Sequence, residues 1–283
     1  FRAKNPKFPF QLFQTEAYDR QVKADLGATI NSINGKNFIK YEFVIPPNPA
    51  EQQKIAACLS SLDEVITAES EKLDLLQDHK KGLLQQLFPA EGETVPKFRF
   101  PEFKDDGDWE EKELKNLILN ISPPKKLKSN QFNESGKYPI VDQSQNEIAG
   151  WTDDDEAIIK IDFPTVVFGD HTCILKIIEK PFVQGAEGIK IFKGNKRIDT
   201  RYLFYALQSN PLIMKEYKRH YSILKEKVII YPDIKTGEQQ KTAACLSAAD
   251  DLLAAQAQKI EALQDHKKGL LQQLFPNLNE LAV

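Results

Sequence analysis

Residues Glu51–Pro89, EQQKIAACLSSLDEVITAESEKLDLLQDHKKGLLQQLFP, recur almost unchanged at Glu238–Pro276, EQQKTAACLSAADDLLAAQAQKIEALQDHKKGLLQQLFP. About two thirds of the aligned positions are identical, and the closing LQDHKKGLLQQLFP is the same in both copies. The segment between the copies resembles neither of them. The same repeat on both sides of an unrelated segment indicates a scaffold, formed by the repeats, that carries separate recognition modules.

Both repeats have the apolar periodicity of a long helix. Apolar residues return every third or fourth position along each repeat, which is the seam of a heptad helix. A polar residue interrupts the seam at the same two places in both copies, Glu69/Gln256 and Lys80/Lys267. Polar seam residues lower stability but fix register and orientation. Each repeat ends at a proline, which stops the helix.

A helix with an apolar seam needs a partner, and the other repeat is the simplest one. If the middle segment folds the chain back, the two helices form an antiparallel coiled coil, with the modules that precede them at opposite ends of a rod. Gly82 and Gly269 lie inside the helices, each at a cost of about 1 kcal/mol relative to Ala. This suggests close backbone approach, either between the helices or to another protein. We interpret His79 and His266 as polar helix residues, not metal ligands.

The composition is that of an ordinary globular protein, with 41% hydrophobic and 28% charged residues. No run approaches the roughly 18 apolar residues of a membrane span, and the first residues lack the core of a signal peptide. The three cysteines lack metal-ligand spacing and fit a reducing compartment, the cytoplasm. We therefore expect no membrane partner, no metal and no cofactor. The missing initial Met suggests a fragment or a trimmed chain.

The charge is unevenly distributed. The formal net charge is −3, yet residues 190–227 carry ten Lys or Arg against three acidic residues. A local basic surface on a mildly acidic protein favours site-directed nucleic-acid binding over general coating of DNA. A solvated helix face is the alternative interpretation.

Between the repeats the sequence predicts a mixed α and β module. A linker rich in Pro, Gly and acidic residues ends at Trp109, and short β-branched and aromatic runs separated by turn residues then predict strands. A helix is predicted over Arg201–Lys218. The predicted strands are Tyr138–Val141, Ala157–Ile161, Thr165–Phe168, Cys173–Ile178, Gly188–Phe192 and Val228–Tyr231.

The first 45 residues resemble the end of that module. A helix is predicted over Phe8–Gln21, followed by a loop and by a strand that leads to Pro46 and Pro47. The middle module ends in the same order before the second long helix. The expected fold class is therefore α+β, with the tail of one module, a helix, a complete module and a second helix.

With these segments in view, nearly the whole chain resembles the specificity (S) subunits of type I restriction–modification enzymes. EQQKIA at the start and LLQQLFP at the end of a long helix carry the resemblance, although the second copy begins more loosely, after PDIKTG. PKFRFPEF…WEEKEL resembles the opening of a target-recognition domain. Further segments resemble one subgroup of such domains: Tyr138–Trp151, Phe168–Thr172, Pro181–Gly188, Arg219–Tyr221 and Leu224-Lys225.

The resemblance implies a non-catalytic DNA-specificity subunit. Each recognition domain would read one half of a split double-stranded DNA target, and the helices would hold the domains apart and dock two methyltransferase (M) subunits. A motor–nuclease (R) subunit would join for restriction. The implied domains are residues 1–48, the remnant of a first recognition domain; 49–90, the central helix; 91–236, the second recognition domain; and 237–283, the distal helix and tail.

A full S subunit has two complete recognition domains, whereas only the tail of the first is expected here, so this chain is expected to read one half of a split target. A second hypothesis is that the chain associates with a copy of itself and reads a symmetric target.

Reading DNA requires cations on phosphates and amide or guanidinium groups on base edges. Asp170-His171-Thr172 is interpreted as a structural loop or a DNA contact, because no nucleophile motif accompanies it. Residues 143–146 are also compatible with a plain polar turn. The phosphate candidates are Lys125, Lys126, Lys128, Lys193, Lys196, Arg197, Lys215, Lys218 and Lys225. The base-reading candidates are Gln143, Ser144, Gln145, Asn146 and Arg219, together with His171, His220 and Tyr221.

Other functional classes fit less well. A nuclease needs clustered carboxylates with a nearby Lys, which Glu156–Lys160 and Asp162 imitate weakly. A methyltransferase needs a glycine-rich cofactor loop after a strand and an Asn/Asp-Pro-Pro-aromatic motif, and Pro46–Pro49 has the wrong order. A coiled-coil scaffold without sequence-specific DNA binding is the main alternative. It explains the helices but leaves the basic stretch without a role.

Overall fold

The computed structural model describes residues 6–26, 33, 35–185, 188–213 and 219–276. The chain divides into two compact units. Unit 1 comprises Phe1–Gln77 and Asp251–Val283, and unit 2 comprises Asp78–Asp250. Both repeats contribute helical residues to both units, and each unit is described by itself below. Among the described residues, no helix combines the length and the hydropathy that a membrane crossing requires.

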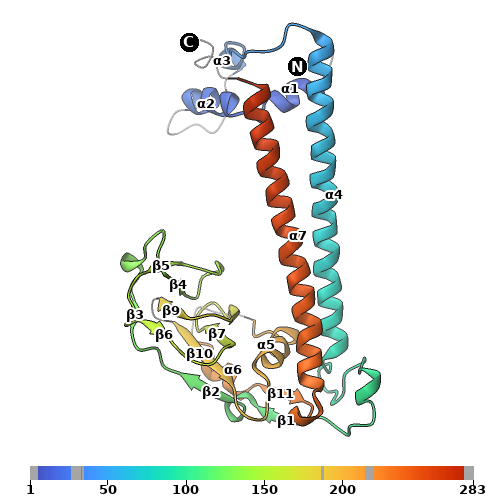
Figure 1. Cartoon of the computed structure of the whole chain (residues 1–283), viewed down its shortest axis with the longest axis vertical. Helices are drawn as coiled ribbons and strands as arrows, with labels where there is room; N and C mark the ends of the chain where they lie inside the picture. Colours follow the sequence, from blue (N-terminus) through green and yellow to red (C-terminus); the bar gives the residue numbers. More distant parts are fainter. Residues whose placement is uncertain (1–5, 27–32, 34, 186–187, 214–218, 277–283) are drawn as a thin grey trace. The chain divides into compact units, whose positions relative to one another are not determined.

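The two repeats form the long helices α4 (Pro49–Leu87) and α7 (Glu238–Leu274), as predicted (Figure 1). The turn before each helix is held in the same way. Gln52 Nε2 donates to the Pro46 carbonyl at 2.7 Å, and Gln239 Nε2 donates to the Pro232 carbonyl at 2.7 Å. These glutamines are the second residue of EQQK in each repeat, so identical sequence makes identical contacts.

In unit 1 the helices pair in antiparallel orientation. Leu59 of α4 lies in one apolar cluster with Leu271 of α7 and with Phe275, which follows the end of α7. Further along α4, Glu69 meets Gln256, which lies earlier in α7. Residue numbers rise along one helix as they fall along the other, which is the antiparallel coiled coil that the periodicity predicted.

Unit 2 contains the opposite ends of the same helices, and they also pair in antiparallel orientation. Lys80 Nζ lies 2.5 Å from Asp250 Oδ1, and Leu87 shares an apolar cluster with Ala243 and Leu246. A Cβ atom built on Gly82 or on Gly269 would meet nothing within 4 Å. Close helix–helix approach therefore does not account for these glycines.

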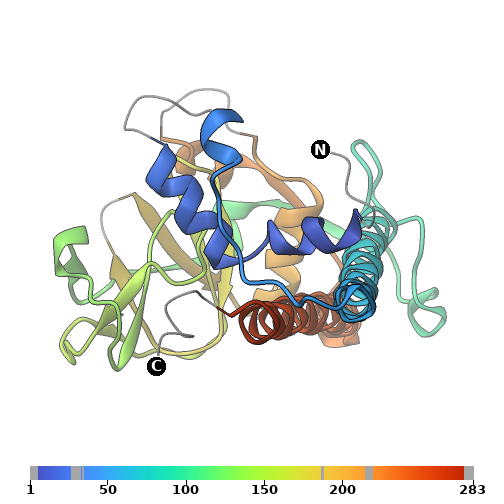
Figure 2. The same cartoon turned by 90° about the horizontal axis from the view of Figure 1, so that it is seen from above.

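The N-terminal residues of unit 1 form α1 (Lys7–Leu12), α2 (Glu16–Asp25) and α3 (Gly35–Phe38). Figure 2 looks along the long helices and shows α1, in dark blue, at their ends. The predicted single helix is interrupted at Thr15, whose Oγ1 accepts a hydrogen bond from Tyr18 N at 3.3 Å and caps α2. The strand predicted before Pro46 was wrong: residues 41–46 form no strand, and they have no partner strand among the described residues.

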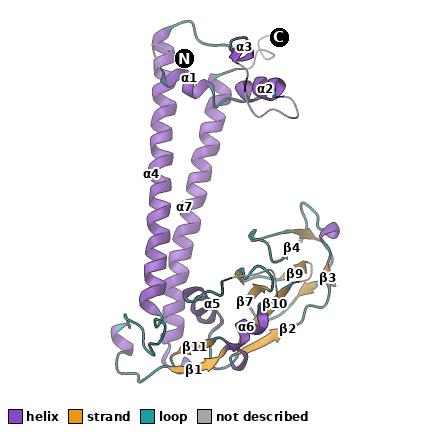
Figure 3. Ribbon diagram, turned by 180° about the vertical axis from the view of Figure 1, so that it is seen from behind, coloured by secondary structure: helices purple, strands orange, loops and turns teal. Residues whose placement is uncertain are grey.

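The described residues of unit 2 form three sheets in addition to the helix ends (Figure 3). A two-stranded sheet pairs β1 with β11 in antiparallel fashion, a four-stranded sheet has the order β2-β10-β7-β8, and a five-stranded sheet has the path β3-β9-β4-β5 with β6 on β9. The strands are β1 (Glu110–Glu113), β2 (Ile118–Ile121), β3 (Lys126–Leu127), β4 (Tyr138–Val141), β5 (Gly150–Thr152), β6 (Ile158–Ile159), β7 (Thr165–Gly169), β8 (Leu175–Ile178), β9 (Phe182–Gly185), β10 (Ile189–Gly194) and β11 (Val228–Tyr231).

Helix α5 (Thr200–Ser209) joins these sheets to the long helices. Its Tyr202 is fully buried, with its ring 5.2 Å from Phe88 and 6.3 Å from Trp109. The helix predicted over Arg201–Lys218 ends at Ser209, because Pro211 follows the last helical turn and Asn210 leaves the helical conformation; residues 214–218 of that prediction lie outside the described residues. Helix α6 (Tyr221–Glu226) precedes β11. Short 3₁₀ turns lie at Pro101–Phe103, Leu114–Asn116, Ser129–Gln131 and Ile234–Thr236.

Candidate nucleic-acid interface

Three loops of unit 2 that are far apart in sequence meet at one place. They are residues 142–146 after β4, residues 169–173 at the end of β7 and beyond it, and residues 219–221 leading into α6, and we call them the three-loop face. Thr172 Oγ1 donates to the Gln143 carbonyl at 2.9 Å, which joins the first two loops. A Cβ atom on Gly169 would clash with the same Thr172 Oγ1 and would lie 3.1 Å from Gln143 Cβ, so the close approach favours glycine. The fold therefore brings candidate base readers from separate segments together.

The loop over residues 142–146 is braced from inside. Ser144 N and Oγ both donate to Asp142 Oδ1, at 2.9 and 2.6 Å. Lys176 Nζ donates to the backbone carbonyls of Asp142 and Asn146, at 2.9 and 2.6 Å. Burial lowers the pKa of Lys176. This framework leaves the amide side chains of Gln145 and Asn146 exposed on an ordered turn.

Asp170 connects the second and third loops. Its side chain is buried, and Oδ1 accepts hydrogen bonds from the backbone amides of His220 at 2.9 Å and Tyr221 at 2.8 Å. The Asp170 amide donates to the Gly188 carbonyl at 2.6 Å. A buried carboxylate is stable when backbone amides compensate its charge, so this residue acts as an organiser of the face.

His220 is an interior residue of this face. Its side chain is 2% exposed, and Nδ1 lies 3.2 Å from the Asp170 carbonyl. Nε2 is buried and has no hydrogen-bond partner among the described residues. Arg219, the adjacent residue, is exposed. Of these two neighbours, the structure gives Arg219 the access to solvent that a base contact needs.

Tyr221 is the aromatic centre of a small cationic surface. Lys190 and Lys225 place their Nζ atoms 5.8 and 5.6 Å from its ring centroid, within the range of cation–π contacts. The Tyr221 hydroxyl donates to Asn120 Oδ1. Burial raises the pKa of Tyr221 to about 12, so the hydroxyl stays protonated at neutral pH. Cations held over this ring, and exposed amides on the loop over residues 142–146 that is joined to it through residues 169–173, provide the two chemistries that DNA reading requires.

The remaining cationic candidates lie on other elements of unit 2. Lys125 Nζ forms an ion pair with Asp154 at 2.5 Å, Lys193 with Asp162 at 3.5 Å, and Arg197 with Glu110 at 4.0 Å. The exposed Lys126 and Lys128 lie on and just after β3, and Lys196 is exposed in the turn after β10. His171 is partly buried within the three-loop face. Lys215 and Lys218 lie outside the described residues.

Sequence reasoning missed several residues that build the face. Lys176 and Asn120 act through contacts with other loops, which no local pattern reveals. Lys190 was counted within the basic stretch but was not a candidate. The glycines were an available signal: a Cβ atom on Gly188 would lie 3.0 Å from the Gln143 amide oxygen. A glycine in or beside a strand marks such a close approach.

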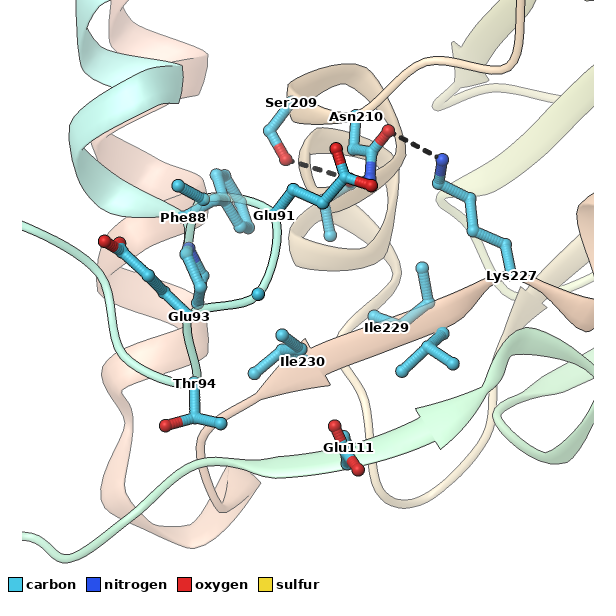
Figure 4. A pocket seen from close by; sticks show the side chains of 15 residues that line it. Phe88, Glu91, Glu93, Thr94, Glu111, Ser209, Asn210, Lys227, Ile229 and Ile230 are labelled. Carbon is cyan, nitrogen blue, oxygen red and sulfur yellow. Dashed lines mark hydrogen bonds between the residues drawn. The ribbon is translucent and has the colours of Figure 1, made fainter.

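Unit 2 also contains a cavity of about 330 Å³ between the turn after α4 and β11 (Figure 4). Figure 4 shows Glu91, Glu93 and Glu111 around it, and Lys227 donates from Nζ to Asn210 Oδ1 at 2.8 Å. Burial lowers the pKa of Lys227. Three carboxylates at its edge repel phosphate, so this cavity is a poor site for DNA. Among the described residues, no cluster of three or more His, Cys, Asp or Glu side chains is arranged to hold a metal ion.

The sequence model of the family described as "Type I restriction modification DNA specificity domain" matches residues 1–78 and 106–265. The chain belongs to this family. Two curated relatives from Methanocaldococcus jannaschii are similar to this specificity-family chain. The putative type I restriction enzyme MjaX specificity subunit is 27% identical over 276 residues, covering 87% of this chain and 61% of the relative. The type I restriction enzyme MjaVIII specificity subunit is 25% identical over 291 residues, covering 88% and 64%.

Solved structures show the same fold for this specificity-family chain. The S subunit of a type I restriction–modification system from M. genitalium aligns with a TM-score of 0.63 at 19% identity, covering 96% of this chain and 73% of that one. A chain from a study of complex assembly and conformational transition of the type I R-M system aligns with a TM-score of 0.57 at 18% identity, covering 95% and 70%. The chain spans a little over three fifths of the length of the curated relatives it matches.

Proposed function

We propose that this type I specificity-family chain reads one half of a bipartite double-stranded DNA target through the three-loop face, and that it docks methyltransferase subunits through its long helices. The observation that carries the proposal is the hydrogen-bonded junction of three loops that carry exposed amides, Arg219 and Tyr221, the last with Lys190 and Lys225 over its ring. In this role the chain is not an enzyme. Methyl transfer and cleavage belong to the M subunits and to a motor–nuclease (R) subunit of the complete complex.

The roles divide by chemistry. Gln145 and Asn146 offer exposed amides for adenine, and Arg219 offers a guanidinium for guanine. Gln143, a base-reading candidate whose Oε1 is buried at Gly188, would position the first loop. Ser144 and His171 lie in the same loops, while His220 would position its neighbours from the interior. Tyr221, with the lysines around it, suits the sugar–phosphate backbone. The phosphate contacts extend to the other proposed cations: Lys125, Lys126, Lys128, Lys193, Lys196, Arg197, Lys215, Lys218 and Lys225.

Exposed apolar residues on the long helices support the docking proposal. In unit 1, Val65 is 44% exposed and Leu75 is 69% exposed, although both lie on a helix that already has a partner. Large exposed apolar side chains on such a helix favour a further protein contact. The open surface at Gly82 and Gly269 also suits close approach of another chain, which is the second explanation for these glycines.

The domain division is part of the proposal. Helix α1 in unit 1 contacts α4 at the repeat position where α5 contacts α7 in unit 2. Gln11 Nε2 donates to Asp63 Oδ2 at 2.7 Å, and the Tyr205 hydroxyl donates to Asp250 Oδ2 at 2.8 Å, with Asp63 and Asp250 at equivalent repeat positions. This supports residues 1–48 as the end of a first recognition domain, followed by a helix at 49–90, a second domain at 91–236 and a distal helix and tail at 237–283.

Association with a second copy remains proposed as a route to a symmetric target, and one chain per complex by native mass spectrometry would exclude it. The three cysteines are free, which fits the proposed location in the cytoplasm.

The test is selection of DNA from a random library by the chain together with methyltransferase subunits of its own system. We expect enrichment of one defined half-site. Gln145→Ala with Asn146→Ala should relax the selected sequence at one or two positions, because each lost bidentate contact removes about 1–3 kcal/mol of discrimination. As a matched control, Gln258→Ala changes an exposed amide on α7 and should leave the selected sequence unchanged. Flat recovery by the wild-type complex would favour the scaffold alternative.

A further inference from the structure

The ring of Tyr221 covers one face of the four-stranded sheet of unit 2. Its centroid lies 6.3 Å from that of Phe168 on β7 and 6.2 Å from that of Phe192 on β10. Both phenylalanines are buried, and Tyr221 packs against their apolar cluster. The sheet therefore holds the ring in place, and the hydroxyl reaches the edge strand β2, where it donates to Asn120 Oδ1.

The strand register puts Asn120 and Lys190 on the same face of the sheet as these rings. Asn120 pairs directly with Phe192, and Lys190 pairs directly with Phe168. Residues directly opposite each other in antiparallel strands share a face, and so do residues two apart along one strand. Asn120 and Lys190 are therefore diagonal neighbours, and such positions are typically about 7–8 Å apart. Both side chains are exposed.

The Tyr221 hydroxyl fixes the orientation of the Asn120 amide. An amide whose Oδ1 accepts this hydrogen bond presents Nδ2, with its two donor hydrogens, at its other end. Burial raises the pKa of Tyr221 to about 12, which keeps the hydroxyl a donor at neutral pH. Within the part of the chain that the structure describes, Nδ2 donates to no other group. Asn120 thus offers hydrogen-bond donors to solvent in a defined direction.

Two lysines beside this amide have no acidic partner. Lys190 and Lys225 contact the Tyr221 ring through their Nζ atoms, and neither forms an ion pair with a carboxylate of the described residues. Lys125 and Lys193, by contrast, each pair with an aspartate. Uncompensated positive charge beside outward-facing donors suits an anion whose oxygens only accept hydrogen bonds.

We propose that Asn120 is a further DNA-contacting residue, and that its amide and the ammonium group of Lys190 bind one backbone phosphate of duplex DNA. The inference rests on the proposed function and adds to it a phosphate ligand that is neutral. Lys225 adds positive charge next to the site. The hydroxyl of Tyr221 has a positioning role, because it acts through the Asn120 amide.

A phosphate suits this site better than an adenine edge. Adenine needs an acceptor as well as a donor from an amide, and the Tyr221 hydroxyl already engages Oδ1. Phosphate oxygens need donors and positive charge, and the site supplies both. The contact would position the duplex without reading its sequence. A guanine edge, which presents two acceptors, is the alternative that the experiment separates from a phosphate.

The test measures binding of random-sequence duplex DNA by the chain together with its methyltransferase subunits, at several salt concentrations. Asn120→Ala should weaken binding about tenfold and leave the salt slope unchanged, because a neutral amide releases no counterion. Lys190→Gln should weaken binding and reduce the slope by about 1 in magnitude. As the matched control, Asn116→Ala removes an exposed amide from the turn before β2 and should bind like the wild type.

A double-mutant cycle tests the positioning role of the Tyr221 hydroxyl. Tyr221→Phe keeps the ring on the sheet but frees the amide, so it should lose part of the affinity that Asn120→Ala loses. The double variant should bind no more weakly than Asn120→Ala alone, because both changes act on one contact. Additive losses would show that the hydroxyl acts independently of Asn120 and would overturn the positioning role.

Duplexes of the selected half-site in which one phosphate at a time is replaced by a neutral methylphosphonate locate the contact. We expect one position at which the replacement weakens binding by the wild type but not by Asn120→Ala. Unchanged affinity of Asn120→Ala for random DNA would overturn the proposal. A changed base preference at one position of the selected sequence would assign Asn120 to guanine and also overturn it.

The two proposals fail in different ways. Flat recovery from the random library, with the affinity loss of Asn120→Ala intact, would reject sequence reading and leave the phosphate site supported. A selected half-site that Asn120→Ala binds as tightly as the wild type does would reject the phosphate site alone. Absence of any DNA binding by the wild-type complex would reject both.

Discussion

Glu69 and Gln256 occupy the same position in the two repeats, and they hydrogen-bond to each other. Gln256 Nε2 donates to Glu69 Oε2 at 2.7 Å and to the Glu69 backbone carbonyl at 2.9 Å. Lys259 adds an ion pair to Glu69 at 2.6 Å. The polar residue in the apolar seam of each helix therefore forms its hydrogen bonds with the polar residue in the seam of the other. A shift of either helix by one turn would separate the two side chains, so the pair specifies register within unit 1.

The stability lost on removing this contact should depend on pH. The pKa of Glu69 lies below its ordinary value because its carboxylate accepts hydrogen bonds from Gln256 and then from Lys259. A lowered folded pKa stabilises the fold above the unfolded pKa, and this contribution is lost as pH falls through the folded value. We expect Gln256→Ala to lower Tm by a few degrees at pH 7, measured by circular dichroism. The difference from wild type should shrink below about pH 4.5, the ordinary pKa of Glu.

Gln258→Ala, an exposed amide two residues away on α7, is the control for helix propensity. A Tm difference for Gln256→Ala that is the same at pH 3 as at pH 7 would contradict a role for the Glu69 carboxylate.

Breaking the buried pair of Arg99 and Glu238 should destabilise unit 2 strongly. Arg99→Ala leaves a 1% exposed carboxylate without its cation, and removal of one partner from a buried pair typically costs about 3–5 kcal/mol. Lys241→Ala, which removes the exposed pair with Glu102 one turn away, should cost less than about 1 kcal/mol. Urea unfolding measures both. Equal costs for the two variants would show that burial of Glu238 does not govern this pair.

Asp170 should control specificity without touching DNA. Asp170→Ala removes the acceptor of two backbone amides and frees residues 219–221, so we expect discrimination between the selected half-site and random DNA to fall. Asp170→Asn keeps a side-chain oxygen at the same place and should retain more discrimination. Both are measured as the ratio of dissociation constants for the two DNAs. Asp105→Ala, an exposed acidic residue of the linker, should leave the ratio unchanged.

Lys225 should contribute affinity and little specificity. A phosphate contact releases counterions, so Lys225→Gln should weaken binding to all sequences alike and reduce the salt slope, d log K/d log [salt], by about 1 in magnitude. The measurement is a series of binding isotherms at increasing salt. Lys72→Gln, which changes an exposed lysine of α4, is the control. A changed preference for one base, with the salt slope unaltered, would instead assign Lys225 to base reading.

The helical half of the architecture could be predicted because its signals are local. The heptad seam of each repeat predicted α4 and α7 and their antiparallel pairing, and the matched polar positions predicted that register is fixed there. The seam contacts of Glu69 and Gln256 confirm this interpretation. The strand expected before Pro46 did not form. A strand is stable only when it pairs with a neighbouring strand, and the local sequence does not show whether such a neighbour is present.

The three-loop face could be predicted only in parts. Its residues were candidates from composition, but their convergence follows from sheets whose strand order is not sequential, such as β2-β10-β7-β8. Nothing local indicates that Thr172 will donate to the Gln143 carbonyl, or that His220 will be buried against Asp170. These contacts depend on which strands, distant in sequence, pair with each other. The alternation of hydrophobic residues within one strand does not specify that pairing.

A lysine and an aspartate recur at equivalent positions of the two repeats, and they also disfavour parallel pairing of the long helices. In unit 1 Lys267 pairs with Asp63, and in unit 2 Lys80 pairs with Asp250. If two repeats instead ran side by side in the same direction and in register, Lys80 would oppose Lys267 and Asp63 would oppose Asp250. Like charges at those positions would repel each other. The residues that pair the helices in antiparallel orientation therefore also disfavour parallel association of helices in nascent or crowded chains.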